Sequence, residues 1–222
     1  FPGIDTLLAA HPLYLPDDIT VQRSRFALPE DCCLFITSFE PHSDVQRKNP
    51  MAVIEAFQQA FGLQDNVHLV IKINNPASDH QVHPYVAELQ EHYAGNKQFH
   101  IITHKLSYPD VLSLYACCDV YVSLHRSEGL GLGMMEAMML GKAVIATAWS
   151  GNMTYMNHTN ACLVNYRLIP ASGSIPAYRE DFANREVLWA EPYIDEAAIW
   201  MRRLANDPIL RAHIGQKAAL DM

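Results

Sequence analysis

The sequence predicts an α/β fold, built on a doubly wound parallel sheet of about six strands with helices at the C-terminal end. Two observations predict it. Short apolar segments rich in valine and isoleucine alternate along the chain with longer segments of helical periodicity. The apolar segments also lack a regular alternation of polar and apolar residues, which is typical of strands covered on both faces. Strands and helices that alternate in this way form a parallel sheet with helices on both faces.

Six segments have the strand pattern, the last of them weakly: residues 32–38, 67–73, 99–103, 120–124, 143–148 and 161–165. Segments with helical spacing lie between and after them, at residues 49–61, 82–93, 109–117, 131–140, 195–205 and 208–220. The fourth helical segment is apolar nearly all round, so we expect it to be buried. In sheets of this kind ligands bind at the carboxyl ends of the strands, so each loop from a strand to a helix is a candidate site.

Residues 167–186 break the pattern. Pro170, Gly173 and Pro176 punctuate this segment, which predicts a long surface loop. The dipeptide Asp207-Pro208, between the last two helices, is a natural signal for a helix to stop and the next to start. We expect residues 1–26 to be a linker or the edge of a missing N-terminal domain, and residues 27–222 to form the sheet domain.

Composition excludes several classes of protein. Of the 222 residues 50% are hydrophobic, which allows a sizeable core, and the formal net charge of −8 argues against general nucleic-acid binding. No apolar run reaches the roughly 20 residues that span a bilayer. The N-terminus has neither a secretory signal nor an initiator methionine. The five cysteines suit neither a disulfide framework nor a zinc site, so we expect buried, reduced thiols.

A cluster of glycines marks the loop after the fourth predicted strand, where Gly129, Gly131 and Gly133 lie between the strand and a helix. Bare backbone amides at the start of a helix, together with the helix dipole, form an anion site, and glycine lets a phosphate approach closely. The alternative is an ordinary tight turn with close packing of helix against sheet. The spacing departs from the dinucleotide fingerprint. The glycines alone therefore leave both interpretations open.

Two carboxylates favour a ligand site. Glu128 precedes the helix, and Glu136 lies about two turns along it in a very apolar setting. A buried carboxylate needs partners, and the hydroxyls of a vicinal diol, such as a ribose, can donate two hydrogen bonds to it. Glu128, nearer the phosphates, would accept hydrogen bonds from a sugar attached to them. The alternative for Glu136 is a hydrogen bond with a neighbouring backbone amide.

The pattern Ser-Glu-Gly-x-Gly-Leu-x-x-x-Glu-Ala-Met, followed by Gly-Lys-Ala-Val-Ile-Ala-Thr at residues 141–147, resembles the retaining glycosyltransferases of family 4, which have the GT-B fold. The resemblance covers most of the chain. It implies one Rossmann-like half of a GT-B fold that binds a nucleotide diphosphate sugar. Glu136 would hold the nucleotide ribose, and Glu128 would lie against the donor sugar and its anomeric centre. The diphosphate would be held by the backbone at Gly129, Leu130, Gly131 and Leu132.

The segment Arg47-Lys48-Asn49-Pro50, after the first predicted strand, supports the same resemblance. Two cations at the start of a helix are an unusual placement, because the helix dipole disfavours them there, so we expect an anion to compensate. In the family a lysine at this position neutralises the donor diphosphate, usually with an arginine nearby, which implies this role for Lys48 and Arg47. The alternative is a solvated basic pair. Many members have a further cation where this sequence has His42.

Three short motifs resemble a subgroup that builds bacterial surface polysaccharides, often from mannose units; they lie at residues 123–126, 149–152 and 189–192. The resemblance implies that His125, Arg126 and Asn152 border the donor pocket. The alternative for each of them is a packing role.

The pocket for the base has no comparable motif. Lys72 and Asn74 lie at the end of the second predicted strand, and His104 follows the third. Because the carboxyl ends of parallel strands share one edge of the sheet, these three residues are further candidates for donor binding.

The resemblance implies transfer of a hexosyl unit, with retention, to a glycan or lipid-linked acceptor. The donor would be GDP-mannose or a UDP-sugar, and Lys48, Arg47 and the glycine amides would stabilise the diphosphate leaving group. We expect no cofactor and no metal, because the GT-B resemblance implies metal independence and the sequence has no Asp-x-Asp motif. The acceptor would bind a missing N-terminal domain, so we expect this fragment alone to be inactive.

Two alternatives differ in class. One is a non-catalytic nucleotide-sugar-binding module. The other is a different GT-B enzyme, such as a sugar-nucleotide epimerase or a phosphorylase, although no pyridoxal-binding lysine is identified. We expect a cytoplasmic protein without affinity for nucleic acid. A lipid-linked acceptor would make the full-length protein peripheral at the inner membrane.

Overall fold

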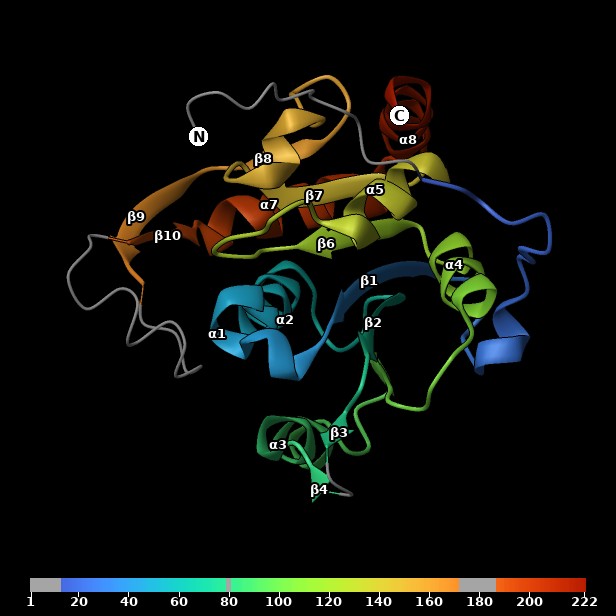
Figure 1. Ribbon diagram of the computed structural model, residues 1–222. Helices are drawn as coiled ribbons and strands as arrows, with labels where there is room; N and C mark the ends of the chain where they lie inside the picture. The colour runs from blue at the N-terminus through green and yellow to red at the C-terminus, as the bar shows by residue number, and fades with distance from the viewer. Residues whose placement is uncertain (1–12, 79–80, 172–186) are drawn as a thin grey trace, which may run out of the picture.

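A parallel sheet of six strands lies at the centre of the structure (Figure 1), a computed structural model that describes residues 13–78, 81–171 and 187–222. Every strand predicted for this sheet is present. In spatial order they are β5 (Phe99–Ile102), β2 (Val67–Ile73), β1 (Cys33–Phe39), β6 (Val120–Ser123), β7 (Ala143–Thr147) and β8 (Cys162–Val164). All five pairings between neighbours are parallel, which confirms the predicted fold class.

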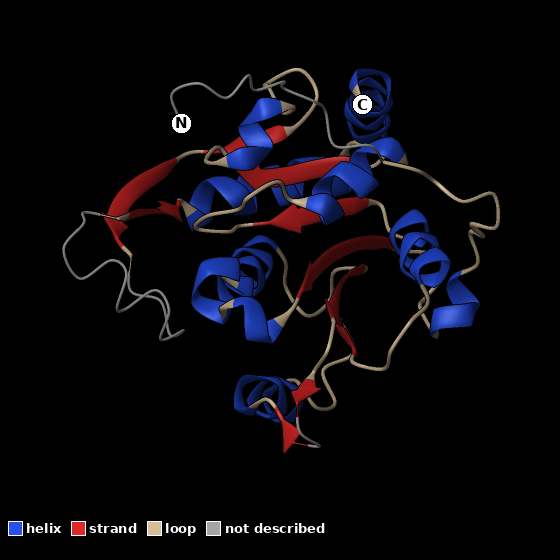
Figure 2. Cartoon of the chain, in the orientation of Figure 1, coloured by secondary structure: helices blue, strands red, loops and turns tan. Residues whose placement is uncertain are grey.

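Helices cover both faces of the sheet, as the lack of polar alternation in the strands predicts (Figure 2). One face packs against α2 (Pro50–Ala60), α3 (Pro84–His92) and α7 (Ile194–Asn206). The other packs against α4 (Tyr108–Cys117) and α5 (Leu132–Met139), and α8 (Pro208–Asp221) contributes to both cores. Within β1, Phe35 points into the first core, and Leu34 and Ile36 point into the second.

Proline in the first turn starts α2, α3, α4 and α8, because its missing N–H would be unpaired there in any residue. Asp207 caps α8 by accepting a hydrogen bond from the backbone N–H of Leu210 at 2.8 Å, which confirms the predicted break between the last two helices. The remaining short elements are η1 (Arg23–Phe26), η2 (Pro41–Ser43), α1 (Val45–Lys48), β3 (Ala77–Ser78), β4 (Gln81–Val82) and η3 (Gly151–Thr154).

The order of the strands creates a switch point between β1 and β6. From β1 the chain proceeds outward through β2 to β5, then returns to β6 and proceeds outward through β7 to β8 on the other side. The loops that follow β1 and β6 therefore leave in opposite directions, and a crevice opens at the carboxyl ends of these two strands. Ligands of doubly wound sheets bind in such crevices.

The prediction of a surface loop from residue 167 is wrong for its first residues. They belong to β9 (Tyr166–Pro170), which pairs antiparallel with β10 (Leu188–Pro192), a strand that the sequence pattern did not predict. Proline was expected to interrupt regular structure here, but Pro170 is the last residue of β9, where a missing N–H costs little. Residues 172–186 of the predicted loop lie outside the described part of the chain.

No helix within residues 13–78, 81–171 and 187–222 is both long and apolar enough to cross a membrane. Three of the cysteines, Cys117, Cys118 and Cys162, are buried as expected, whereas Cys32 and Cys33 are half-buried. Burial raises the pKa of the Cys33 and Cys162 thiols to about 12, so both are held as thiols at neutral pH.

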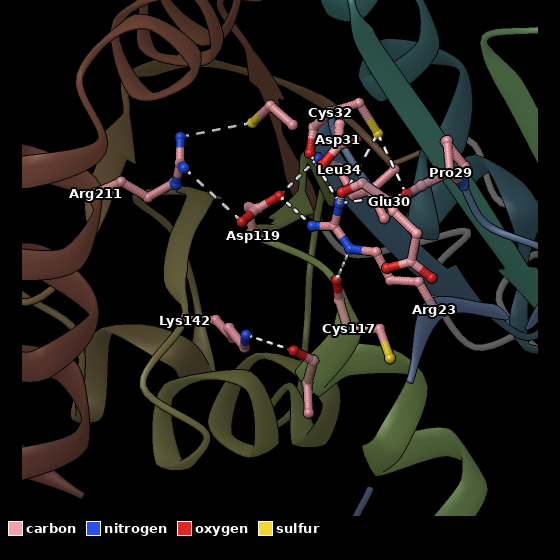
Figure 3. Close-up of polar contacts among 12 residues, drawn as sticks. Arg23, Pro29, Glu30, Asp31, Cys32, Leu34, Cys117, Asp119, Lys142 and Arg211 are labelled. Carbon is pink, nitrogen blue, oxygen red and sulfur yellow. Dashed lines mark hydrogen bonds and ion pairs between the residues drawn. The ribbon is translucent and has the colours of Figure 1, made fainter. Parts of the chain in front are cut away.

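Asp119 joins three parts of the chain at the amino-terminal edge of the sheet (Figure 3). Its carboxylate accepts hydrogen bonds from Arg23 Nη2 at 2.9 Å and from the backbone N–H of Leu34 at 2.8 Å. Arg211 Nη2 of α8 lies 3.8 Å from its other oxygen. Arg23 also donates to the carbonyl oxygens of residues 30, 32 and 117. These hydrogen bonds hold the segment before β1 against the sheet. The predicted domain boundary at residue 26 stays a prediction.

We expect Asp119→Asn to lower the free energy of unfolding by about 2 kcal/mol, because two arginines lose their carboxylate partner in a partly buried site. Urea denaturation followed by circular dichroism measures this difference. Asp110→Asn is the control, since Asp110 pairs only with the more exposed Arg25 among the described ion pairs, and its loss should cost less than about 1 kcal/mol. Equal losses in the two variants would contradict the importance assigned to Asp119.

Candidate functional site

A cavity of about 770 Å³ opens at the switch point between β1 and β6. Its wall consists of the ends of β1 and β6, the end of α1, residues of α4 and α5, and the loop between β6 and α5. Most of the residues predicted for the site line it together: Arg47, Lys48, Asn74, Glu128, Gly129, Leu130, Gly131, Leu132 and Glu136. These residues come from three segments that are far apart in the sequence, namely the end of α1, the end of β2, and the glycine loop with α5, so the fold itself assembles the site.

An ion cluster occupies one wall of the cavity. Lys48 Nζ donates a hydrogen bond to Glu128 Oε1, and Arg47 Nη1 lies 3.4 Å from Glu128 Oε2. Arg47 is fixed further, because its guanidinium donates to the carbonyl oxygens of Ser127 at 2.8 Å and Ser43 at 3.0 Å. The Glu128 side chain is only 10% exposed. The cluster is therefore shielded from water and weakly screened.

The two cations control the charge of Glu128. Burial by itself would raise the pKa of this carboxyl, but the charge and hydrogen bond of Lys48, together with the charge of Arg47, outweigh it and hold the pKa below its usual value. Glu128 is therefore an anion at neutral pH, and the cluster carries two positive charges against one negative charge.

The placement of the cations differs from the prediction that they start a helix. They lie in the last turn of α1, a single helical turn that begins after Asp44, whose carboxylate accepts from the next backbone N–H groups at 2.8 and 3.3 Å. Asn49 then adopts a left-handed conformation (φ 51°) and α2 starts afresh. Cations are favoured at the end of a helix. The two cations therefore need no external anion, because their place at the end of α1 and the carboxylate of Glu128 already compensate them.

Hydrogen bonds from the segment that follows β7 hold the glycine loop, residues 128–131, in place. The backbone N–H of Glu128 donates to Ser150 Oγ at 2.8 Å, and the Glu128 carbonyl accepts from the N–H of Gly151 at 3.1 Å. The hydroxyl of Tyr155 donates to the carbonyl of Leu130 at 2.7 Å. Gly131 has a φ of 82° and starts α5. The N–H groups of Met134 and Met135 pair with the Gly131 carbonyl, whereas the amides from Gly129 to Leu132, which border the cavity, donate to no group among the described hydrogen bonds.

Glu136 lies on α5 at the other side of the cavity and is buried. Burial raises the pKa of its carboxyl, and a hydrogen bond from Tyr108 opposes the rise. The hydroxyls of Tyr115 and Tyr121 lie nearby and close to the backbone of Gly133, where an added Cβ would lie 2.4 Å from the Tyr121 oxygen. The cavity thus has a floor of hydroxyls beside a carboxylate of unusually low acidity.

Sequence reasoning missed these tyrosines and the β1 residues Thr37 and Ser38, which also line the cavity. Tyr115 and Tyr121 lie in apolar segments that predict a buried helix and strand, and their rings are indeed buried. Both residues nevertheless line the cavity, and periodicity carries no signal for that. Tyr108 could have been found, because it is the first residue of α4, directly after the loop that follows strand β5.

His125 and Asn152 do not line the cavity. His125 is fully buried, and its ring nitrogens contact Ser123 Oγ at 3.0 Å, the Trp149 carbonyl at 3.1 Å and Asn152 Oδ1 at 3.2 Å. Asn152 in turn donates to the carbonyl of Thr147 at 2.9 Å. Burial lowers the pKa of His125, so the ring is neutral at pH 7. The pair joins the loops after β6 and β7; a direct donor contact for either residue stays a prediction.

Arg126, Lys72 and His104 also lie outside the lining. Arg126 donates to both carboxylate oxygens of Glu191, at 2.6 and 3.0 Å, and borders a separate hollow of about 530 Å³ beside α1. Lys72 is buried, which lowers its pKa, and its Nζ donates to the carbonyls of Ile73 at 2.8 Å and His104 at 3.3 Å. The side chain of His104 is exposed. Their roles in donor binding stay predictions.

Within the described ranges, no three side chains of histidine, cysteine, aspartate or glutamate come together as a metal-binding group.

Comparison with known protein families gives a match over residues 38–167 to the family described as glycosyl transferases group 1. These residues are more than half of the chain and include both the ion cluster and the glycine loop. The chain belongs to the glycosyl transferases group 1. Its described residues thus form a family member's α/β domain, and the predicted resemblance is confirmed.

A curated relative is the serotype-specific mannosyltransferase WbdA of Escherichia coli, which is 28% identical over 139 residues. These cover 60% of this chain but 16% of WbdA, so the chain corresponds to a small part of its curated relatives.

Solved structures show the same fold. The C-terminal domain of the group 1 glycosyl transferase LpcC from Francisella tularensis is 20% identical, with a TM-score of 0.64 over 94% of this chain and 92% of that domain. The lipopolysaccharide glycosyltransferase WaaG is 18% identical, with a TM-score of 0.64 over 93% of this chain and 47% of WaaG. Anabaena HepE, solved with UDP and glucose, has a TM-score of 0.60 at 19% identity, over 86% of this chain and 43% of HepE.

We expect Gly151→Ala to destabilise the loops around the cavity by about 2 kcal/mol, because the new Cβ would lie 1.8 Å from the Gly129 carbonyl oxygen and the backbone would have to move. Thermal and urea denaturation measure the loss. Gly129→Ala is the matched control, since its Cβ would meet nothing within 4 Å. If the two variants were equally stable, the close approach of these loops would be refuted.

Proposed function

We propose that this chain is the donor-binding domain of a retaining glycosyltransferase, and that the cavity between β1 and β6 binds a nucleoside diphosphate sugar. The observation that supports it best is the meeting of a cation pair, a glycine loop at a helix start and two carboxylates in one cavity at the switch point of the sheet. Each of these groups suits one part of such a donor, and the chain's membership of the glycosyl transferases group 1 agrees with it.

The diphosphate fits the wall formed by Lys48, Arg47 and the start of α5. The two cations supply charge, and the unpaired amides from Gly129 to Leu132 supply directed hydrogen bonds together with the helix dipole. The same groups would stabilise the charge that develops on the leaving diphosphate when the glycosidic bond breaks. One preorganised donor of this kind lowers the barrier by roughly 3 kcal/mol.

The two carboxylates suit the two sugars of the donor. Glu136, buried near three tyrosine hydroxyls, is assigned to the ribose, because a vicinal diol can donate two hydrogen bonds to one carboxylate. Glu128, beside Lys48, is assigned to the transferred sugar and its anomeric centre. Asn74 lines the cavity at the end of β2 and is our candidate for contacts toward the base.

We propose a front-face transfer of a hexosyl unit to a glycan or a lipid-linked acceptor, in which the acceptor is held by a second domain outside this chain. The similarity to a mannosyltransferase favours GDP-mannose, and HepE's complex with UDP and glucose makes a UDP-sugar the alternative donor. We further propose that the protein acts in the cytoplasm, in polysaccharide biosynthesis, and that this domain binds the donor without transferring the sugar by itself.

Lys48→Ala should weaken the binding of UDP and GDP at least about tenfold, because a charge-assisted hydrogen bond to the diphosphate is lost. Isothermal titration calorimetry on this chain, with inorganic pyrophosphate, UDP and GDP, measures the change. Lys105→Ala, which removes an exposed lysine that is not part of the cavity lining, is the control. Undiminished binding of all three ligands by Lys48→Ala would exclude its role at the diphosphate.

Glu136→Ala should weaken UDP and GDP about tenfold and leave pyrophosphate almost unchanged, because only the nucleotides carry a ribose. The same titrations test it, with Glu55→Ala, an exposed carboxylate of α2, as the control for charge. An equal loss of affinity for pyrophosphate would show that Glu136 acts through the groups that bind the diphosphate, and it would refute the assignment of Glu136 to the ribose.

A further inference from the structure

The ion pair between Lys48 and Glu128 joins two groups that the proposed function assigns to different parts of the donor. Lys48 is assigned to the diphosphate and Glu128 to the sugar, yet in the structure the ammonium donates its hydrogen bond to the carboxylate. A carboxylate and a phosphate are both oxyanions, and a lysine ammonium binds either as a compact point charge. Glu128 therefore competes with a diphosphate for Lys48.

Geometry makes this competition strong. The side chains of Lys48 and Glu128 are 22% and 10% exposed, so their attraction is weakly screened by solvent. Arg47 is held by two backbone carbonyls as well as by Glu128, so it cannot take the place of Lys48 without breaking those contacts. The backbone of Glu128 is held by Ser150 and Gly151. Any exchange of partners is thus confined to the side chains of Lys48 and Glu128.

The charge of the wall depends on where the Glu128 carboxylate lies. With the ion pair formed, Arg47 and Lys48 present one net positive charge to a ligand. If the carboxylate turns to accept hydrogen bonds from sugar hydroxyls instead, Lys48 is freed and the diphosphate meets both cations. A sugar attached to the diphosphate supplies those hydroxyls, and a bare nucleoside diphosphate does not.

We propose that Glu128 makes the cavity select the sugar-loaded donor over the spent nucleoside diphosphate. The inference rests on the proposed function, and it assigns Glu128 a second role in addition to its contact with the anomeric centre of the sugar. Before transfer, the hexosyl hydroxyls hold the carboxylate and Lys48 binds the diphosphate. After transfer the hydroxyls leave with the acceptor, the carboxylate returns to Lys48, and the nucleoside diphosphate is displaced. The ion pair between Lys48 and Glu128 thereby weakens the binding of the nucleoside diphosphate product.

The test is to remove the competing charge with Glu128→Gln and to titrate this chain with pyrophosphate, UDP and GDP. For those of pyrophosphate, UDP and GDP that bind the wild type, the affinity of the variant should be about tenfold higher, because Lys48 no longer has an anionic partner. The ratio of affinities between UDP-glucose and UDP, and between GDP-mannose and GDP, should fall toward one for the pair that binds. Glu128→Ala removes the same charge and should show the same gain, so the result does not depend on how glutamine packs.

Glu40→Gln is the matched control. Glu40 lines the same cavity and loses the same charge, but its carboxylate accepts from the backbone N–H of His42. It should leave the affinity for pyrophosphate within about twofold of wild type. Weaker or unchanged binding of pyrophosphate and nucleotides by both Glu128 variants would overturn the proposal and leave the donor site intact. Failure of the wild type to bind any of these ligands would instead refute the proposed function and this inference with it.

Discussion

The position of β1 between β2 and β6 is the constraint on which the rest of the structure depends. β1 pairs with β2 along its whole length, to Phe39, whereas its ladder with β6 pairs only Phe35 with Val120 and Ile36 with Tyr121. The two strands therefore separate toward their carboxyl ends. The separation leaves the end of β1 facing the start of α5, and both the cavity and its hydroxyl floor follow from this geometry. Asp119, which precedes β6, fixes the same two strands at their opposite ends.

The sequence predicts the sheet well because strand and helix patterns are local, and each apolar segment is long enough to identify by itself. It also predicts which loops form the cavity, since strand ends in a parallel sheet share one edge. It fails where structure depends on distant partners. β9 and β10 form an antiparallel ribbon in which apolar and charged residues are mixed, so neither strand has the continuous apolar pattern of the central strands. Helix α1 is too short to show any periodicity.

A sequence motif does not specify the direction in which a side chain points. His125, Asn152 and Lys72 are polar residues at or after the ends of strands, as expected, but each side chain turns toward polar groups of the protein and is buried there. A polar group next to a cavity can be satisfied from either side, and the sequence does not state which. Conversely, Tyr121 is part of an apolar strand but brings a hydroxyl to the cavity.

An acidic protein that binds a diphosphate must balance its charges locally. The cavity holds Arg47 and Lys48, but also the carboxylates of Glu40, Glu128 and Glu136, so its charge gives a distant anion little attraction. Burial raises the pKa of Glu136 above its usual value, which makes this carboxylate easier to neutralise than a free glutamate. Affinity for the proposed diphosphate ligand must then come from contacts made at short range. The neutral amides at the start of α5 gain importance for this reason, because they bind an anion without a counter-charge that a neighbouring carboxylate can take away.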